Sequence, residues 1–230
     1  MQAVKRELEK LKNPEKAKVL SRFFKTGKGE YGEGDIFLGV NVPEQRKIAK
    51  KYRDAGFREL KNLLSSGIHE HRLTALLILV EKYKAADENM KNQVADFYIT
   101  NLTSVDNWDL VDLSADKILG DYFFDKDKSI FYKLAKSGNL WERRASIVAT
   151  FNFIRKGKFD ETLRIAELLL SDKHDLIHKA VGWMLREIGK RDQEVEENFL
   201  RKHHKKMPRT MLRYATERFS ENKRRFYLST

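Results

Sequence analysis

Apolar residues recur at intervals of three and four along nearly the whole chain, and Gly, Pro, Asn and Asp gather between the resulting segments. This spacing is typical of α-helices with one or more buried faces. It predicts helices over residues 2–12, 14–26, 43–54, 57–66, 69–85, 88–102, 107–123, 127–137, 140–157, 160–171, 174–191, 193–206 and 208–220. The pattern therefore predicts an all-α protein.

The longer apolar helices repeat at a period of 34 to 37 residues. Their charged or aromatic starting residues are Arg72, Trp108 or Asp109, Arg144, Lys179 and Arg213. A period of this size is typical of solenoids, in which helix pairs stack and equivalent positions align on one wall. We therefore predict a HEAT-like α-α superhelix with a concave basic groove, formed by a single domain over residues 1–230.

Consecutive repeats carry an unusual set of side chains near their starts. Trp108 and Arg144 stand at the start, and Asp112 and Trp183 stand four residues after it. Positions four apart share a helix face, so the register predicts all of them in one groove. A structural alternative stays open, in which Asp109 or Asp112 caps a helix or pairs with an Arg of a neighbouring repeat.

Composition indicates a folded protein of a reducing compartment. Hydrophobic residues make up 41% of the 230 residues, which is enough for a core, and cysteine is absent, so no disulfide framework exists. The N-terminal residues lack the apolar region of a secretory signal, and no stretch approaches the roughly 20 apolar residues that cross a bilayer. We expect a soluble, cytoplasmic and nucleoid-associated protein.

Charge points to a polyanionic partner. The chain carries 46 Lys and Arg against 34 Asp and Glu, a net charge of +12. Residues 201–225 contain ten Lys or Arg and two Glu, interleaved with apolar residues such as Met211 and Leu212. This interleaving favours a folded basic helix over a solvated tail, and a basic surface binds phosphates by releasing counterions.

Other conspicuous motifs favour structural interpretations. The glycines of residues 27–32 match G-x-G-x-x-G, but a helix precedes them instead of a strand, so we predict a flexible loop beside the cleft. His174 and His178 have the spacing of a zinc-protease helix, but Asp175 replaces the glutamate and no third ligand is evident. Trp141 is out of phase with the groove residues and is predicted to lie in the core. We expect no metal and no cofactor.

Several segments together resemble the HEAT-like-repeat alkylpurine DNA glycosylases of the AlkD type, over nearly the whole chain. The matching segments include Asn13-Pro14-Glu15-Lys16-Ala17, Phe37-Leu38-Gly39-Val40, Trp108-Asp109-Leu110-Val111-Asp112 and Lys179-Ala180-Val181-Gly182-Trp183-Met184-Leu185-Arg186-Glu187. They occur in the order typical of that family.

The resemblance implies hydrolysis of the N-glycosidic bond of cationic N3- or N7-alkylated purines in duplex DNA. It implies that Trp108 and Trp183 cradle the deoxyribose of the damaged nucleotide, that Asp112 is the catalytic carboxylate, and that Arg144 holds the adjacent phosphate. Phe23 stands where the best-known type has a tyrosine, so its contact with DNA is expected to be apolar. The resemblance also implies that no dedicated base pocket is needed.

Further DNA contacts are expected from Arg143, Lys179, Arg209 and Arg213. The expected partner is alkylated double-stranded DNA, bound by a monomer without a membrane or an obligate protein partner. Two other functions stay open from the residues themselves. One is a non-catalytic HEAT-like module that binds damaged or branched DNA, and the other is a scaffold that binds an acidic protein partner.

Overall fold

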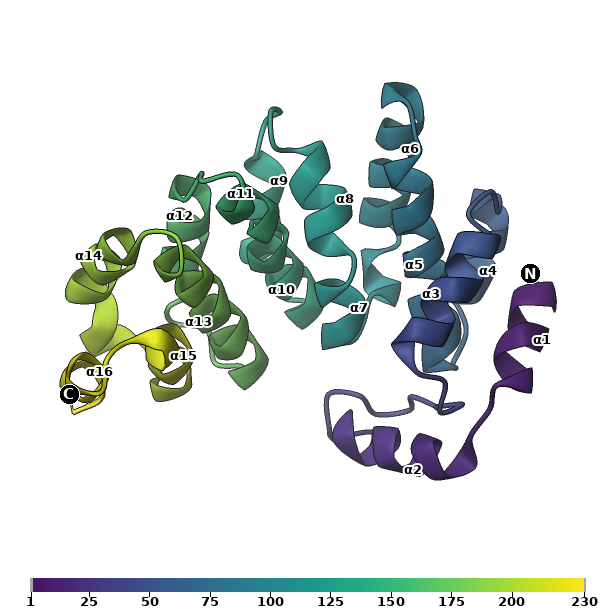
Figure 1. The fold of residues 1–230 in the computed structure, drawn as a ribbon, viewed down its shortest axis with the longest axis horizontal. Coiled ribbons are helices and arrows are strands. Elements are labelled where there is room, and N and C mark those ends of the chain that lie inside the picture. The colour runs from purple at the N-terminus through teal and green to yellow at the C-terminus, as the bar shows by residue number, and fades with distance from the viewer. Residues whose placement is uncertain (1, 230) are drawn as a thin grey trace. The chain divides into compact units, whose positions relative to one another are not determined.

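A computed structural model describes residues 2–229 of the protein. Helices dominate these residues, and the strand-type pairing that they contain is limited to an isolated parallel bridge between Ile36 and Ile68. The chain divides into two compact units, Met1–Ser114 and Ala115–Thr230 (Figure 1). The predicted all-α repeat fold is confirmed. No helix within residues 2–229 has the length and apolar character required to span a membrane.

The N-terminal unit is built around one helix that is buried over almost its whole length. Its elements are α1 (Gln2–Lys10), α2 (Pro14–Phe23), α3 (Val42–Lys51), α4 (Phe57–Leu64), α5 (His69–Lys84), α6 (Glu88–Thr100), the 3-10 turn η1 (Leu102–Ser104) and α7 (Trp108–Asp112). Helix α5 packs against α3 and α4 and is buried on almost all sides, as its apolar circumference predicts. Asn13, Asn41 and Asn107 cap α2, α3 and α7 through their side-chain oxygens.

The C-terminal unit is also helical. Its elements are α8 (Ala115–Tyr122), α9 (Ser129–Ala135), α10 (Leu140–Ala149), α11 (Phe151–Arg155), α12 (Asp160–Leu168), α13 (Asp175–Gly189), α14 (Gln193–His203), η2 (His204–Lys206), α15 (Arg209–Ala215), η3 (Thr216–Arg218) and α16 (Glu221–Leu228). Helices α10 and α13 are buried over most of their length. Helix α13 is central and packs against α10 and α15. Trp141 is buried in this core, as predicted.

Two of the predicted helices divide at a residue whose side chain is a hydroxyl. The predicted helix 107–123 divides into α7 and α8 at Ser114, whose hydroxyl donates to the carbonyl of Leu110 at 2.5 Å. The predicted helix 140–157 divides into α10 and α11 at Thr150, whose hydroxyl donates to Ile147 O at 2.7 Å. Such side-chain bonds compete with the helical ladder. The sequence pattern also missed α16.

One hydrogen bond recurs at the start of three buried helices. Arg72 Nη1 donates to Ser66 O at 3.0 Å, and Arg143 Nη1 donates to Ser137 O at 3.0 Å. His178 Nε2 lies 2.5 Å from Asp172 O. Each donor is the fourth residue of its helix (α5, α10 or α13) and follows its carbonyl by six residues. The structural register therefore matches Arg72 with Arg143, one residue away from the Arg144 that the sequence period selected.

Candidate active site and nucleic-acid interface

Helix α7 presents Trp108 and Asp112 one turn apart. Asn107 accepts a hydrogen bond from the Trp108 backbone N–H at 2.8 Å and so fixes where the helix begins. The indole stacks on Phe24 with ring centroids 4.9 Å apart, and the exposed ring of Phe23 meets its edge at 5.8 Å. Trp108 and Asp112 are both half-buried, so the carboxylate lies beside an aromatic surface and still reaches solvent.

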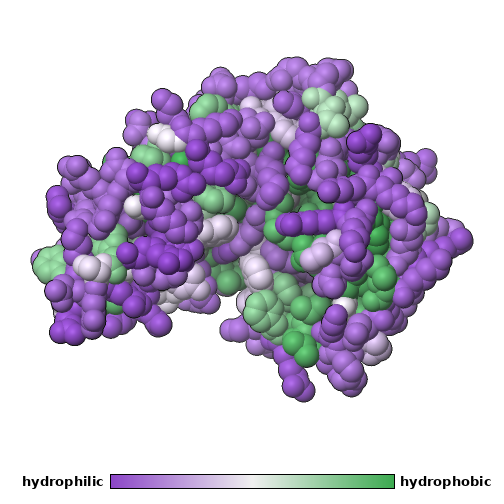
Figure 2. Space-filling view, in the orientation of Figure 1, coloured by the Kyte–Doolittle hydropathy of each residue, from purple (hydrophilic) through white to green (hydrophobic). Residues whose placement is uncertain are grey.

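These residues line a cavity inside the N-terminal unit. It has a volume of about 390 Å³, and its walls come from α2, the segment 37–45, α5 and α7. Phe23, Phe24, Phe37 and Trp108 make its lining mostly aromatic. Figure 2 shows hydrophobic side chains gathered on this unit beside α2, on a face that is hydrophilic over most of its area. The cavity has the size of a small-molecule site, typically roughly 300–1,000 Å³.

A buried histidine bridges two carboxylates behind the aromatic wall. His69 Nδ1 lies 3.1 Å from Asp35 Oδ2, and its Nε2 lies 2.9 Å from Asp109 Oδ2. Burial by itself lowers the pKa of His69, but the adjacent carboxylates outweigh it and raise the pKa to about 9. His69 is therefore an imidazolium at neutral pH that donates to both carboxylates. Its ring also stacks on Phe37, with centroids 4.5 Å apart.

The network ties the end of the glycine-rich loop to the core. Arg72 binds Asp35 through Nη2, and its Nε lies 3.1 Å from Asp106. Asn107 Nδ2 donates to Asp35 at 3.1 Å. Burial raises the pKa of Asp35, but the hydrogen bond from His69 and the charge of Arg72 bring it below its ordinary value. The loop that the sequence suggested to be flexible is thus anchored at its C-terminal end.

Glu70 organises the backbone that forms another wall of the cavity. Its carboxylate is buried and accepts hydrogen bonds from the backbone N–H groups of Leu38, Gly39 and Val40 at 2.8 to 3.2 Å. The sequence predicts a helix from residue 69, but it does not reveal that the whole charged run 69–72 is buried. The sequence does contain one signal of this burial, because the charged run stands directly before the apolar residues of the same helix. Charges buried there would require hydrogen-bonding or ionic partners elsewhere in the chain.

Asp109 and Asp112 have different environments although they are three residues apart. Asp109 is 7% exposed and bonded to His69, whereas Asp112 is half-buried on the cavity lining. A structural pairing of the kind left open above is seen for Asp109, with His69 in place of the expected arginine. Asp106 takes the arginine pairing, with Arg72. Asp112 is the carboxylate of this segment that lies at the cavity with access to solvent.

The C-terminal unit holds Arg144 and Trp183. Arg144 is buried at 5% exposure, and its Nη1 donates to the carbonyl of Leu176 on α13 at 2.5 Å. Trp183 is half-buried, with its ring centroid 5.6 Å from that of Phe151. Arg144 and Lys179 are each the fifth residue of their helix, as the predicted period requires, but the fifth residue of α7 is Asp112 and not the predicted Trp108. Convergence of the C-terminal residues with the N-terminal residues on one DNA groove stays a prediction.

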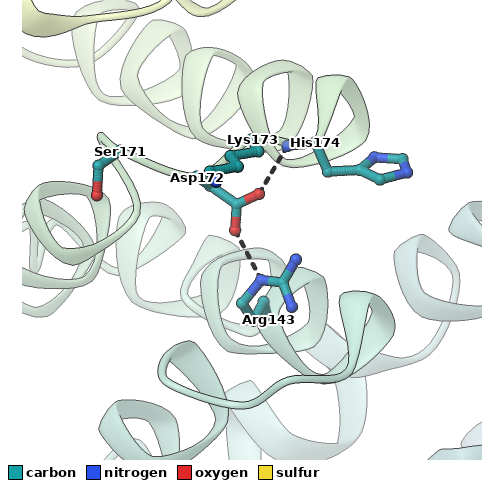
Figure 3. A pocket seen from close by; sticks show the side chains of 5 residues that line it. All are labelled: Arg143, Ser171, Asp172, Lys173 and His174. Atoms are coloured by element: carbon teal, nitrogen blue, oxygen red, sulfur yellow. Dashed lines mark hydrogen bonds and ion pairs between the residues drawn. The ribbon is translucent and has the colours of Figure 1, made fainter.

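Arg143 forms an ion pair with the loop before α13. Its Nε donates to Asp172 at 2.6 Å, and its Nη1 donates to two carbonyl oxygens of the loop before α10. Figure 3 shows Arg143 and Asp172 pointing toward one another beside a pocket of about 400 Å³, while the His174 ring points away. His174 accepts the Leu176 N–H at 3.2 Å and caps α13, which accounts for its position in the structure.

The remaining candidate cations differ in exposure. Lys179 is half-buried and pairs with Asp175 at 2.7 Å. Arg209 and Arg213 are exposed on α15, and Arg209 donates to the carbonyl of Leu228 at 2.8 Å. Met211 is buried on the opposite side of α15, so the basic segment is folded, as predicted. Arg213 is therefore well placed to meet a polyanion from solvent.

A family model described as DNA alkylation repair enzyme matches residues 4–219. A solved structure described as a predicted DNA alkylation repair enzyme from Enterococcus faecalis is 18% identical and has a TM-score of 0.71, covering 91% of this chain and 97% of that one. At this identity the likeness shows the fold alone. No curated protein matches the chain.

Proposed function

Because the chain belongs to the DNA alkylation repair enzyme family, we propose that it is a DNA glycosylase for cationic N3- or N7-alkylated purines in duplex DNA. The observation that carries the proposal is the half-buried carboxylate of Asp112, held beside the Trp108 indole at an aromatic cavity. The net charge of +12 supports a DNA partner.

An alkylated purine that carries a positive charge needs little help to leave. When its glycosidic bond breaks, the base takes the bonding electrons and departs neutral, so no strong general acid is required. Positive charge then builds up on the deoxyribose, as in the oxocarbenium-like transition states of glycoside hydrolysis. The chief catalytic requirement is therefore a negative charge near the sugar.

Asp112 meets that requirement. Its carboxylate stabilises the developing sugar cation and orients the water that attacks the anomeric carbon. The Trp108 face adds cation–π attraction of about 0.5–2 kcal/mol to the same charge. Trp108 is itself fixed by its stack on Phe24, so its orientation is set before substrate arrives.

Phosphate binding is assigned to the C-terminal unit. Arg213 and Arg209 are exposed and are the proposed direct contacts, together with the half-buried Lys179. Arg144 is also proposed to hold a phosphate, as the family resemblance implies, although it is buried and donates to the carbonyl of Leu176. Replacing Arg213 or Arg144 by Ala is expected to lower the salt dependence of DNA binding, each by about one unit of slope.

The decisive assay is release of 7-methylguanine from methylated duplex DNA. Asp112→Asn keeps the size of the side chain but removes its charge, and a loss of about 100-fold or more in the single-turnover rate is expected. Asp54→Asn, at a carboxylate that is 93% exposed on the same unit, is the matched control and is expected to retain the rate.

Two results would oppose the proposal in different ways. Equal release by wild type and Asp112→Asn would show that the proposed mechanism is wrong. DNA binding without release by wild type would replace the glycosylase with a module that binds damaged or branched DNA.

A further inference from the structure

The helix that carries Trp108 and Asp112 is too short to fix its own orientation. Helix α7 consists of residues Trp108–Asp112, a little more than one turn. A helix of this length is unstable by itself, because it closes very few internal hydrogen bonds. Leu110 and Val111 bury its inner side, but apolar burial has no preferred direction. The direction of the helix, on which the aim of Asp112 depends, must therefore be set by directional contacts with other segments.

Polar contacts hold the start of α7 at three points and join it to α5 and to the end of the glycine-rich loop. The pairs are Asp106 with Arg72 Nε, Asn107 Nδ2 with Asp35, and Asp109 Oδ2 with His69 Nε2, at 3.1, 3.1 and 2.9 Å. Asn107 also accepts the Trp108 backbone N–H at 2.8 Å, so its contact reaches the helix backbone directly. Contacts at three of four consecutive residues leave the start of the helix little freedom to rotate.

Asp35 connects these contacts to one another. Its Oδ1 accepts a hydrogen bond from Arg72 Nη2, and its Oδ2 lies 3.1 Å from both His69 Nδ1 and Asn107 Nδ2. The Asp35 side chain is only 10% exposed, so solvent screens these interactions weakly. We refer to Asp35, His69 and Arg72 together as the α7 clamp. All three lie outside α7, so they act on it from neighbouring segments.

His69 makes both of its contacts only as a cation. Its Nδ1 faces Asp35 and its Nε2 faces Asp109, and ionised carboxylates accept hydrogen bonds but donate none. A neutral imidazole has a single N–H, so deprotonation leaves one of the two contacts without a hydrogen. Its neighbours in other elements are Asp35, Asp109, Phe24 and Phe37, and on its own helix Arg72 pairs with the same Asp35.

We propose that Asp35 and His69 are positioning residues, which hold α7 so that Asp112 and Trp108 meet the substrate in one orientation. The proposal rests on the proposed function, since it concerns how the Asp112 carboxylate is aimed at the deoxyribose. Both residues act through α7 and not through contact with the reacting atoms. The end of the glycine-rich loop thereby takes part in the reaction.

Single-turnover release of 7-methylguanine at saturating enzyme tests the positioning. His69→Gln and Asp35→Asn are each expected to slow release about tenfold to 100-fold, because small displacements of a catalytic group have effects of this size. Affinity for the methylated duplex is expected to stay within about twofold of wild type, since the proposed phosphate contacts belong to the other unit. Wild-type rates in both variants, or a loss of affinity in place of a loss of rate, would overturn the proposal.

Thr74→Val is the matched control. Thr74 is buried on α5 and donates to Gln45 at 3.2 Å, so the variant removes a buried hydrogen bond of the same helix and leaves the α7 clamp intact. It is expected to retain the wild-type rate. A rate in Thr74→Val as low as that in His69→Gln would show that any weakening of α5 slows release, and would overturn the positioning role.

The pH dependence separates positioning from a general loss of stability. Because the pKa of His69 is about 9, wild type is expected to lose its advantage over His69→Gln as the pH rises. The ratio of the two rates is expected to shrink about threefold between pH 7 and pH 9.5, where circular dichroism shows both proteins to be folded. Thr74→Val is expected to keep a constant ratio to wild type. A ratio of wild type to His69→Gln that does not change would overturn the proposal.

Trp108 reports on the α7 clamp without any change in it. In a protein with Trp141→Phe and Trp183→Phe, the decay of fluorescence anisotropy measures the local motion of Trp108. Its fast component is expected to grow from pH 7 to pH 9.5, and to be independent of pH once His69→Gln is added. If wild type releases no base but Trp108 loosens in this way, the glycosylase is refuted and the clamp stands. If release occurs while the motion of Trp108 is the same at both pH values, the clamp is refuted and the glycosylase stands.

Discussion

Titration of His69 is expected to couple the stability of the N-terminal unit to pH. Its pKa rises from an ordinary 6.5 to about 9 because Asp109 and Asp35 hold the imidazolium against the effect of burial. A pKa raised in the folded state gives stability that is complete below pH 6.5 and is lost as the pH rises toward 9. The shift corresponds to about 3 kcal/mol between pH 6 and pH 10, most of which remains at pH 7.

The measurement is urea unfolding between pH 6 and pH 10, with wild-type His69 and with His69→Gln. Trp141→Phe and Trp183→Phe in both proteins leave Trp108 fluorescence as a reporter of the N-terminal unit. His69→Gln cannot carry the charge, so its deficit relative to the His69 protein is expected to shrink as the pH rises. The difference between the two proteins also cancels other titrating groups. A difference that does not vary with pH would refute the ionic bridge.

Three further predictions concern packing and buried charge. Burial raises the pKa of Glu196 to about 8, so the stability of the wild type falls as the pH rises from 4.5 toward 8. In urea unfolding, Glu196→Gln is expected to be more stable than wild type by about 3 kcal/mol at pH 7 and equally stable at pH 4. Glu70→Ala leaves three buried N–H groups of residues 38–40 unpaired and is expected to cost about 3 kcal/mol or more in the same assay. Gly120→Ala puts a Cβ 2.1 Å from a neighbouring carbonyl oxygen and is expected to destabilise the protein by about 1–3 kcal/mol, which lowers its melting temperature. A Cβ at Gly138 meets nothing within 4 Å, so Gly138→Ala serves as the control. Equal melting temperatures for the two glycine variants would contradict the close approach.

The positions of most helical segments could be predicted from the sequence, but the breaks within two of them could not. The apolar period continues through Ser114 and Thr150, because residues on both sides of each break still face the core. At each break a hydroxyl bonds a backbone carbonyl, but Ser146 makes the same kind of bond within α10, which stays intact. Hydrophobic spacing therefore carries no information about them.

The candidate site divides in the same way. The prediction that Trp108 and Asp112 share a helix face needs only local information, because it depends on their spacing of four within α7. The structure places both residues on the cavity. The bridge from Asp35 through His69 to Asp109 joins residues 34 and 40 positions apart. Such pairing depends on tertiary packing, so no local motif distinguished the structural Asp109 from the candidate catalytic Asp112.

The recurring bond to the carbonyl six residues earlier has a consequence for how the chain tolerates insertions. Inserting one residue between Ser137 and Arg143 would turn the guanidinium by about 100° around α10 and carry it off its carbonyl. The loops at the other ends of these helices, such as residues 85–87 after α5, lie outside the segment that this bond spans, so the bond does not fix their length. Length variation among homologous proteins is therefore expected to collect in those opposite loops, while the spans 66–72, 137–143 and 172–178 keep their lengths.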